Sequence, residues 1–389
     1  MKIFKRLLGF LAAAAVAVSS AAGAAGEIEK DDEIYAMLEA MPVAGLAVIE
    51  CGSGKMLYEK AATEQMPMGH LAKLMTLLFA AESLENGGAK IDDLITVSDN
   101  AGSKGGISVW LERGEKISFE EALKAVTVSN ANDACTALAE YLSGSEESFV
   151  EQANSRCMEL GLKATHFSDC CGLEENTVSN AAEIALISAE LVRHELLTPF
   201  VTCWMDQVRE GKAQLVNRNR LVRTYKGIRG LKECYNDGTG ECAAAAAERG
   251  GMTVAVVALG CDTQDSCTQI CKKMLDLSFE HFSVFRPIAD EEWTAPIPVA
   301  GGVRDTVRLT ADELRPIVVS KGSTAKAEIE FKKTEVLQAP VKKGTVVGTV
   351  VCRSNDEVLY SLSIRAAEDV EKMNFRCGFL KLVYNLLSF

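Results

Sequence analysis

The apolar periodicity of the chain changes at a segment rich in proline and glycine, and this change constrains the fold more than any other feature. Residues 286–302 hold three of the eight prolines and end in two adjacent glycines. Such a segment is typical of a linker between domains. Before it, helical spacing alternates with short apolar runs, and after it apolar residues recur at every second position. The sequence therefore predicts two domains, over 27–285 and 303–370, joined by a linker.

Three stretches of the first domain predict helices. Apolar side chains spaced three and four residues apart predict a helix over 70–84. Ser118 and Glu121 can each accept a hydrogen bond from the other's backbone N–H, and this capping box predicts a second helix start. A third helix is expected over 180–197.

Apolar runs predict strands in both domains. Residues 46–49 and 252–259 are short, apolar and bounded by glycine, which indicates buried strands. Five alanines over 243–247 favour a helix by propensity alone, so their class stays open. Beyond the linker the alternation predicts a small all-β domain with one buried face. Its alternating apolar residues are Ala325, Ala327, Ile329 and Phe331 in one run, and Val358, Tyr360, Leu362 and Ile364 in another.

Both ends of the chain suggest an exported protein at a membrane surface. Residues 1–26 start with basic residues, continue with an apolar run of about a dozen residues and end in small residues, which is typical of a signal peptide; the alternative is a retained anchor helix. Residues 371–389 are apolar with interspersed cations and predict an amphipathic helix at a membrane interface, or one packed on the protein's own surface. We expect the mature protein on the outer face of the cytoplasmic membrane, at the cell wall.

Composition excludes two other classes of protein. The formal net charge of −13 argues against a nucleic-acid binder, because phosphate neutralisation needs basic patches. No run of 18 apolar residues occurs after the signal segment, which excludes a polytopic membrane protein. The 13 cysteines are an odd number, contain no C-x-x-C pair and often lie among apolar residues. We therefore expect most of them to be small buried side chains, and we expect no metal or cofactor.

Four ordered segments of the first domain carry the most specific sequence signal of the chain. They are 65–76 (QMPMGHLAKLMT), 130–133 (NAND), 162–173 (LKATHFSDCCGL) and 227–234 (GIRGLKEC). In this order they resemble the motifs of the D-alanyl-D-alanine carboxypeptidases, the low-molecular-mass penicillin-binding proteins. The second domain, with 339–344 (APVKKG), resembles the C-terminal β domain of that family. The resemblance implies an α+β fold: a β-lactamase/transpeptidase-like domain with an antiparallel sheet flanked by helices, then a small all-β domain and the amphipathic helix.

The resemblance also assigns roles, and several positions depart from the family pattern. The family's nucleophilic serine is replaced by His70, while Lys73, which assists that nucleophile, is retained. The family's second serine is replaced by Asn130, while Asn132 is retained. In the family's K-T-G motif, which holds the substrate carboxylate, Lys232 is retained but the threonine and glycine are replaced by Glu233 and Cys234. A carboxylate at position 233 is expected to repel the substrate's carboxylate.

Three hypotheses follow from this pattern. The first is a catalytically inactive homologue that binds peptidoglycan stem peptides or wall-synthesis proteins. The second is an active carboxypeptidase that uses His70 or Cys234 as nucleophile, with Ser129 in place of the second serine. The third is a metal or redox site in which His70, Glu233 and Cys234 converge. We expect the first, because a lost nucleophile costs several orders of magnitude in rate. The retained Lys73 and Lys232 could also serve only a buried polar network.

Overall fold

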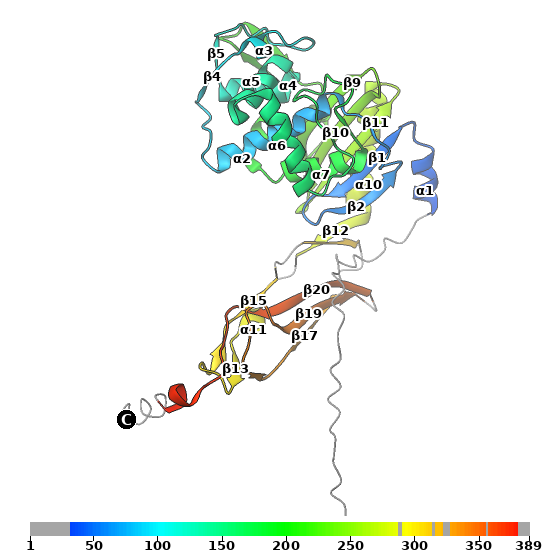
Figure 1. Ribbon diagram of the computed structural model, residues 1–389. Helices are drawn as coiled ribbons and strands as arrows, with labels where there is room; N and C mark the ends of the chain where they lie inside the picture. Colours follow the sequence, from blue (N-terminus) through cyan, green and yellow to red (C-terminus); the bar gives the residue numbers. More distant parts are fainter. Residues whose placement is uncertain (1–31, 287–289, 313–315, 322–326, 355–356, 380–389) are drawn as a thin grey trace, which may run out of the picture. The chain divides into compact units, whose positions relative to one another are not determined.

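The computed structural model describes residues 32–286, 290–312, 316–321, 327–354 and 357–379, and these fall into two compact units (Figure 1). The first, larger unit comprises Glu27–Asp290 and Glu313–Lys326, and the second contains Glu291–Asp312 and Ala327–Phe389. The signal peptide expected over 1–26 and the last ten residues of the expected membrane tail lie outside the described residues. Residues 375–379 are helical. Within the described ranges, no helix combines the length and the apolar character that crossing a membrane requires.

An antiparallel sheet of five strands forms the centre of the first unit. Its order is β2-β1-β11-β10-β9, and every neighbouring pair is antiparallel. The predicted strands over 46–49 and 252–259 are confirmed as parts of β1 and β11. The strands are β1 (Gly45–Glu50), β2 (Lys55–Lys60), β9 (Ile228–Asn236), β10 (Gly240–Arg249) and β11 (Met252–Cys261).

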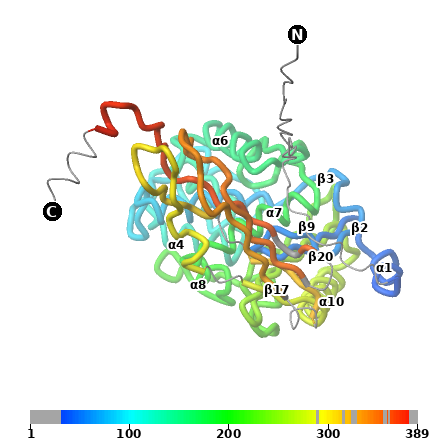
Figure 2. Tube along the Cα trace, turned by 90° about the horizontal axis from the view of Figure 1, so that it is seen from below, coloured from blue at the N-terminus to red at the C-terminus, as the bar shows by residue number. Residues whose placement is uncertain are grey.

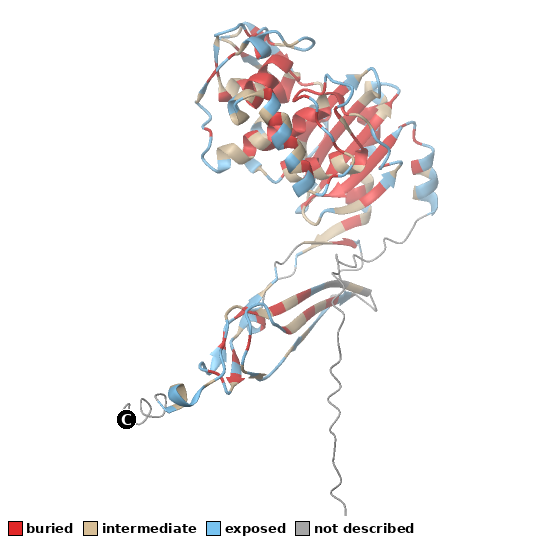
Figure 3. Ribbon diagram, viewed as in Figure 1, coloured by how far each residue is buried: buried red, intermediate tan, exposed pale blue. Residues whose placement is uncertain are grey.

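Side chains of the central strands alternate between two apolar layers, because successive residues of a strand face opposite sides. Ala244, Ala246 and Val257 belong to the core on one side, together with the helices of the middle of the chain. Ala243, Ala245 and Val256 belong to the core on the other side, with α10 (Gln264–His281). Figure 2 shows α6 and α7 on one side of the sheet and α10 on the other, and Figure 3 shows that the strands of this sheet are largely buried. The fold class expected for this domain is confirmed.

The alanine run over 243–247 is the clearest case in which tertiary context overrides local propensity. These residues lie in β10, between β9 and β11, and all are buried. Alanine favours a helix in isolation. Here small side chains let both helical layers approach the middle of the sheet closely, and burial on both faces outweighs the preference.

Most helices cover the first face of the sheet, whereas Leu38 of α1 and Leu221 of α9 belong to the core on the second face, with α10. The predicted capping box is present: Ser118 and Glu121 open α4. The third predicted helix begins after its N-cap Asn180 but ends at Leu191, earlier than expected. The helices are α2 (Lys73–Glu85), α4 (Phe119–Ser129), α5 (Asn132–Ser143), α6 (Glu146–Glu159) and α7 (Ala181–Leu191), with the shorter α1 (Asp32–Glu39), η1 (Gly69–Ala72), α3 (Asp99–Gly102), η2 (Glu195–Leu197), α8 (Thr198–Val201) and α9 (Leu221–Thr224).

Short strand pairs complete the first unit. Strand β12 directly follows α10 and pairs with β16. In sequence, β16 comes after the first stretch of the second unit, Glu291–Asp312, but it belongs to the first unit. A disulfide links Cys261, at the end of β11, to Cys267 in α10. The pairs are β3 (Met66–Pro67) with β6 (Val178–Ser179), β4 (Leu94–Thr96) with β5 (Lys116–Ser118), β7 (Met205–Val208) with β8 (Ala213–Val216), and β12 (Phe282–Phe285) with β16 (Ile317–Ser320).

The second unit is built almost wholly of strands, as the alternation predicts. One sheet has the order β15-β20-β19-β17 and another the order β14-β13-β18. The segment expected as a linker contributes to this unit, since α11 and β13 lie within 286–302. Its elements are α11 (Glu291–Thr294), β13 (Ile297–Ala300), β14 (Thr306–Val307), β15 (Leu309–Ala311), β17 (Ala327–Lys333), β18 (Leu337–Gln338), β19 (Val346–Ser354) and β20 (Glu357–Ala366).

Candidate active site

The start of α2 presents the first two candidate residues. His70 lies in the short 3-10 helix η1, and Lys73 is the first residue of α2. Leu71, between these two residues, and Leu74, directly after Lys73, are buried and fix this segment against the core. As a result the Lys73 side chain is fully buried, while His70 stays half-buried.

Lys73 is held by two acceptors inside the fold. Its Nζ donates to Asn132 Oδ1 at 2.7 Å and to the carbonyl oxygen of Cys171 at 3.1 Å. Asn132 in turn donates through Nδ2 to the carbonyl oxygen of Gly105 at 2.7 Å. A buried cation needs such partners, because desolvation is costly without them. The structure thus brings Lys73 and Asn132 together, as their motif positions imply.

Asn130 occupies the corner between α4 and α5 and joins it to strand β9. Its backbone is left-handed, with φ of 63°, a conformation that asparagine tolerates better than most residues. Its Nδ2 donates to the carbonyl oxygen of Glu233 at 2.9 Å, and its Oδ1 accepts from Lys232 Nζ at 2.8 Å. Asn130 therefore acts as a bridge, with both ends of its amide in use.

Lys232 is nearly fully buried and points toward α4. Its Nζ donates to the carbonyl oxygen of Val126 as well as to Asn130. Burial, and then the charge of Lys73, lower the pKa of Lys232 to about 7. At neutral pH this side chain is therefore charged in only about half of the molecules.

Glu233 lies on the opposite face of β9 from Lys232, since neighbouring strand residues alternate. Its carboxyl group accepts from Gln264 Nε2 at 3.1 Å and from Thr268 Oγ1 at 3.2 Å, both on α10. Burial raises its pKa to about 7. The expected repulsion between this carboxylate and a substrate carboxylate is therefore not a feature of this geometry, because the side chain is committed to α10.

Cys234 returns to the face of Lys232 and lies beside the start of α2. A Cβ on Gly69 would lie 3.5 Å from its Sγ, which shows how closely η1 and β9 approach. The pKa of Cys234 is lowered, first by hydrogen bonding with Cys242, and also by Lys73 and by the backbone N–H groups of Leu71 and His70. The thiol of Cys234 therefore lies near the backbone N–H groups of His70, the nucleophile position, and of Leu71.

The His70 imidazole has little capacity to act as an acid near neutral pH. Burial, and then the charges of Lys73 and Lys232, lower its pKa to about 3. The ring is therefore neutral across the physiological range. Lys73 donates to Asn132 and to the Cys171 carbonyl and not to the His70 ring. Among the hydrogen bonds described here, none therefore places Lys73 as a base beside His70.

Two neighbouring residues, Ser129 and Asp133, are bonded within the fold. Ser129 donates through Oγ to the carbonyl oxygen of Ala125 at 2.8 Å, within its own helix. Asp133 lies in the first turn of α5, whose N-cap is Ala131. The Asp133 carboxylate accepts from the backbone N–H groups of Val109 and Leu111 and anchors the loop that precedes β5.

The hypothesis of a metal centre made by His70, Glu233 and Cys234 is wrong for this geometry. Glu233 faces α10, whereas the other two lie on the opposite side of β9. Over the described ranges, the side chains that gather closely enough to share an ion are Cys135, Cys170 and Cys171. Sequence reasoning missed this group, although the adjacent cysteines of 170–171 in a motif-like segment were a usable signal.

The segment 165–173 packs closely against η1 at Gly172. A Cβ on Gly172 would lie 1.7 Å from the carbonyl oxygen of Gly69, and its φ is +75°. Only glycine fits such a contact without displacing the backbone. This approach places the Cys171 carbonyl oxygen within reach of Lys73.

Comparisons with known proteins agree with this architecture. The profile of the D-alanyl-D-alanine carboxypeptidase family (peptidase S11) matches residues 39–263, and that of the C-terminal domain of penicillin-binding protein 5 matches 282–372. The chain is 35% identical to the D-alanyl-D-alanine carboxypeptidase DacF of Bacillus subtilis, over 84% of this chain and 86% of the relative. It is 30% identical to DacC of Escherichia coli, over 84% of each. Penicillin-binding protein 5 of Haemophilus influenzae has a similar structure, with a TM-score of 0.76 and 25% identity, covering 85% of this chain and 98% of that one.

Proposed function

Because the chain belongs to the D-alanyl-D-alanine carboxypeptidase family, we propose that it is a catalytically inactive member that binds at the cell wall without hydrolysing peptides. The observation that carries this proposal is the residue at the nucleophile position. His70 has no hydroxyl group, and its neutral ring has no positioned base. Loss of the nucleophile removes several orders of magnitude of rate in serine hydrolases.

The hydrogen bonds of the other motif positions support the same proposal. Asn130 offers an amide in place of a hydroxyl that could relay a proton, and both ends of that amide are bonded within the fold. Lys73 and Lys232 each have two acceptors in the protein. These residues therefore have a sufficient reason to persist as two buried polar groups: Lys73 joins α2 to α5, and Lys232 with Asn130 joins β9 to α4.

The surroundings of Cys234 add a further obstacle to acyl transfer. Its side chain stands where the family motif has glycine, beside the N–H groups of His70 and Leu71. Backbone N–H groups at a nucleophile stabilise the oxyanion of an acyl-transfer reaction. Because these N–H groups favour the Cys234 thiolate, the thiolate would compete with a substrate oxygen for them.

The proposed role is that of a binder or scaffold in peptidoglycan metabolism. Its partners would be stem peptides or wall-synthesis proteins, and its location the outer face of the cytoplasmic membrane. The signal-like segment and the family membership support export, and the apolar tail supports peripheral attachment to the membrane.

The test is intact-mass analysis of the purified chain after incubation with excess penicillin. We expect no covalent adduct, with folding verified by circular dichroism. A mass increase of one penicillin per chain would overturn the proposal, and peptide mapping would then identify the nucleophile. The same protein with His70→Ser, Asn130→Ser, Glu233→Thr and Cys234→Gly restores the family motifs and serves as the matched comparison.

One observation favours a second candidate, an active carboxypeptidase with Cys234 as nucleophile. The pKa of this thiol is lowered, and a thiolate is a strong nucleophile. Its burial opposes this function, since it is only 1% exposed. Hydrolysis of a peptide ending in D-Ala-D-Ala that disappears in Cys234→Ala, but persists in His70→Ala, would establish the second candidate in place of the first.

A further inference from the structure

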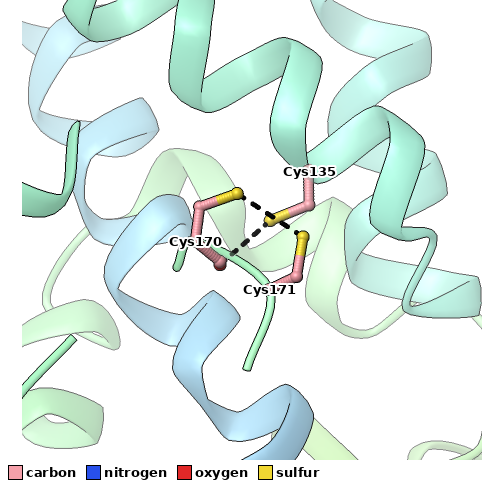
Figure 4. Close-up of side chains that lie close together, drawn as sticks. All are labelled: Cys135, Cys170 and Cys171. Atoms are coloured by element: carbon pink, nitrogen blue, oxygen red, sulfur yellow. Dashed lines mark hydrogen bonds between the residues drawn. The ribbon is translucent and has the colours of Figure 1, made fainter. Parts of the chain in front are cut away.

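Three cysteine side chains converge in the core next to, but outside, the motif residues described above (Figure 4). Cys135 comes from α5, and Cys170 and Cys171 from the segment that Gly172 presses against η1. All three are fully buried, and their sulfur atoms lie within 4.8 Å of one another. Two elements that are distant in sequence thus direct three thiols into one small volume.

The spacing of the sulfurs suits a single metal ion. Three thiolates that bind one Zn²⁺ at about 2.3 Å have sulfur–sulfur distances of roughly 3.8 Å in tetrahedral geometry. The Cys170 and Cys171 sulfurs are 3.4 Å apart, and the upper limit for the remaining pairs is 4.8 Å. Coordination therefore requires side-chain shifts of less than about an ångström from a geometry that is already assembled.

As free thiols, Cys135 and Cys171 make only weak hydrogen bonds to backbone oxygens. Cys135 Sγ donates to the carbonyl oxygen of Cys170 at 3.4 Å, and Cys171 Sγ to that of Asn132 at 3.4 Å. Thr136 Oγ1 lies 3.5 Å from both adjacent sulfurs. Thiols are weak donors. These contacts give a modest gain compared with three thiolate–metal bonds.

The charges around the cluster fit a divalent ion. Three thiolates and one divalent cation carry a net charge of −1. The Lys73 ammonium acts on Cys135 and Cys171, and it is bonded to the carbonyl oxygen of Cys171. Glu146 Oε1 accepts from Cys170 Sγ at 3.2 Å, and the same carboxylate pairs with Lys104 at 2.6 Å. If Glu146 is the fourth ligand, its added negative charge is therefore matched by Lys104.

We propose that Cys135, Cys170 and Cys171 form a binding site for one thiophilic divalent cation, Zn²⁺. On binding, the three thiols lose their protons to solvent and three sulfur–zinc bonds form, with no change of oxidation state. The role is structural: because the site is fully buried, the ion ties the segment 170–171 to α5 rather than exposing a reactive position. This inference does not depend on the proposed function, since that function rests on other side chains: His70, Lys73, Asn130, Lys232 and Cys234.

The test measures metal in the purified full chain with its thiols reduced. We expect close to one equivalent of zinc to survive dialysis. After removal of zinc by a chelator, titration with Cd²⁺ is expected to produce the near-ultraviolet thiolate–cadmium absorption and to saturate at one ion per chain. Added Zn²⁺ is expected to raise the melting temperature of the metal-free protein.

Matched alanine variants distinguish this site from other buried cysteines. Cys135→Ala and Cys171→Ala are expected to weaken Cd²⁺ binding at least 100-fold. Cys157→Ala, in the same apolar core but outside the cluster, is expected to bind like the unaltered chain. Circular dichroism of each variant verifies folding, and the Zn²⁺-induced rise of the melting temperature is read on the folded variants.

Three results would overturn the proposal. One is a folded, reduced chain that binds no stoichiometric Zn²⁺ or Cd²⁺. Another is full retention of Cd²⁺ absorption in the Cys135→Ala and Cys171→Ala variants. The third is a mass spectrum of the chain, as isolated, that shows a disulfide between any two of the three cysteines.

Discussion

At the scale of single residues, the candidate site is a set of buried groups that satisfy one another. Lys73 and Lys232 each find two oxygen acceptors, and Asn130 serves Lys232 and the backbone of β9 at once. A network of this kind stabilises the fold only if every member is present, because an unpaired buried polar group costs more than a bond contributes.

Replacement of Asn130 tests the network directly. Asn130→Gly keeps a residue that tolerates the left-handed backbone but removes both amide bonds, one of them to the buried Lys232. We expect the free energy of unfolding to fall by about 2–3 kcal/mol in urea titrations. Ser129→Ala, one residue earlier, removes only a bond within the helix and is expected to change stability by less than about 0.5 kcal/mol. Equal effects of the two substitutions would contradict the bridging role.

Glu233 gives the chain a distinct dependence on pH. Its pKa rises from 4.5 to about 7 on folding, so between these values the folded state holds more protons than the unfolded state. The stability that this group contributes is therefore complete below pH 4.5 and decreases as pH rises to 7. In Glu233→Gln this decrease is absent. The stability of the variant relative to the unaltered chain should increase by about 1–3 kcal/mol from pH 4.5 to 7.

Urea unfolding of both proteins at several pH values checks this expectation. Other titrating groups, including His70 and Lys232, are common to both chains and cancel in the difference. Two stability curves that run parallel from pH 4.5 to 7 would mean that the carboxyl group of Glu233 has an ordinary pKa.

At the scale of elements, the contact between η1 and the segment 165–173 positions the site. It depends on the absence of a side chain at Gly172, where a Cβ would meet the Gly69 carbonyl. The sequence indicates a helix near 70–84, but not that its first turn is a 3-10 turn held by a distant glycine. Such a contact has no local signature, because it depends on two segments about a hundred residues apart.

Substitution of Gly172 tests the importance of this contact. Gly172→Ala would place a Cβ 1.7 Å from a carbonyl oxygen, and we expect a loss of more than about 4 kcal/mol or failure to fold. Gly114 has nearly the same φ, +76°, but a Cβ added there would have no atom within 4 Å, so Gly114→Ala should cost only about 1–2 kcal/mol. Thermal melts of the two variants separate two costs: Gly114→Ala has only the cost of a positive φ, whereas Gly172→Ala also has the steric clash. Similar melting temperatures would argue against the close approach.

Strand alternation and packing explain which elements can be predicted from sequence. Strands β1 and β11 are predictable because each contains a run of apolar residues with glycine close to both ends. The class of 243–247 is not, since its burial between two strands is a tertiary property. The motif resemblance predicts Glu233 as a site residue. It does not take into account that successive strand residues point to opposite faces, which directs the Glu233 side chain toward α10.

At the scale of the whole molecule, the division into two units follows from the change of periodicity in the sequence. The boundary is harder to predict, because α11 and β13 lie in the proline-rich segment and β13 pairs with β14 and β18. Proline cannot donate to a strand ladder, but Pro298 is paired only with Thr306 of β14, because β18 pairs with the next two residues, Val299 and Ala300. Composition therefore indicates a junction in this region, but it cannot separate a linker from a short strand.

The nearly half-charged Lys232 also has a calorimetric consequence for any anionic ligand. With a pKa of about 7, this side chain lacks a proton in roughly half of the molecules at neutral pH. A ligand carboxylate that settles beside it would favour the charged form, so binding would draw a fraction of a proton from the buffer. The heat of binding at pH 7 should then differ between phosphate and Tris by an amount set by their ionisation enthalpies. Identical heats would place the ligand's charge away from Lys232.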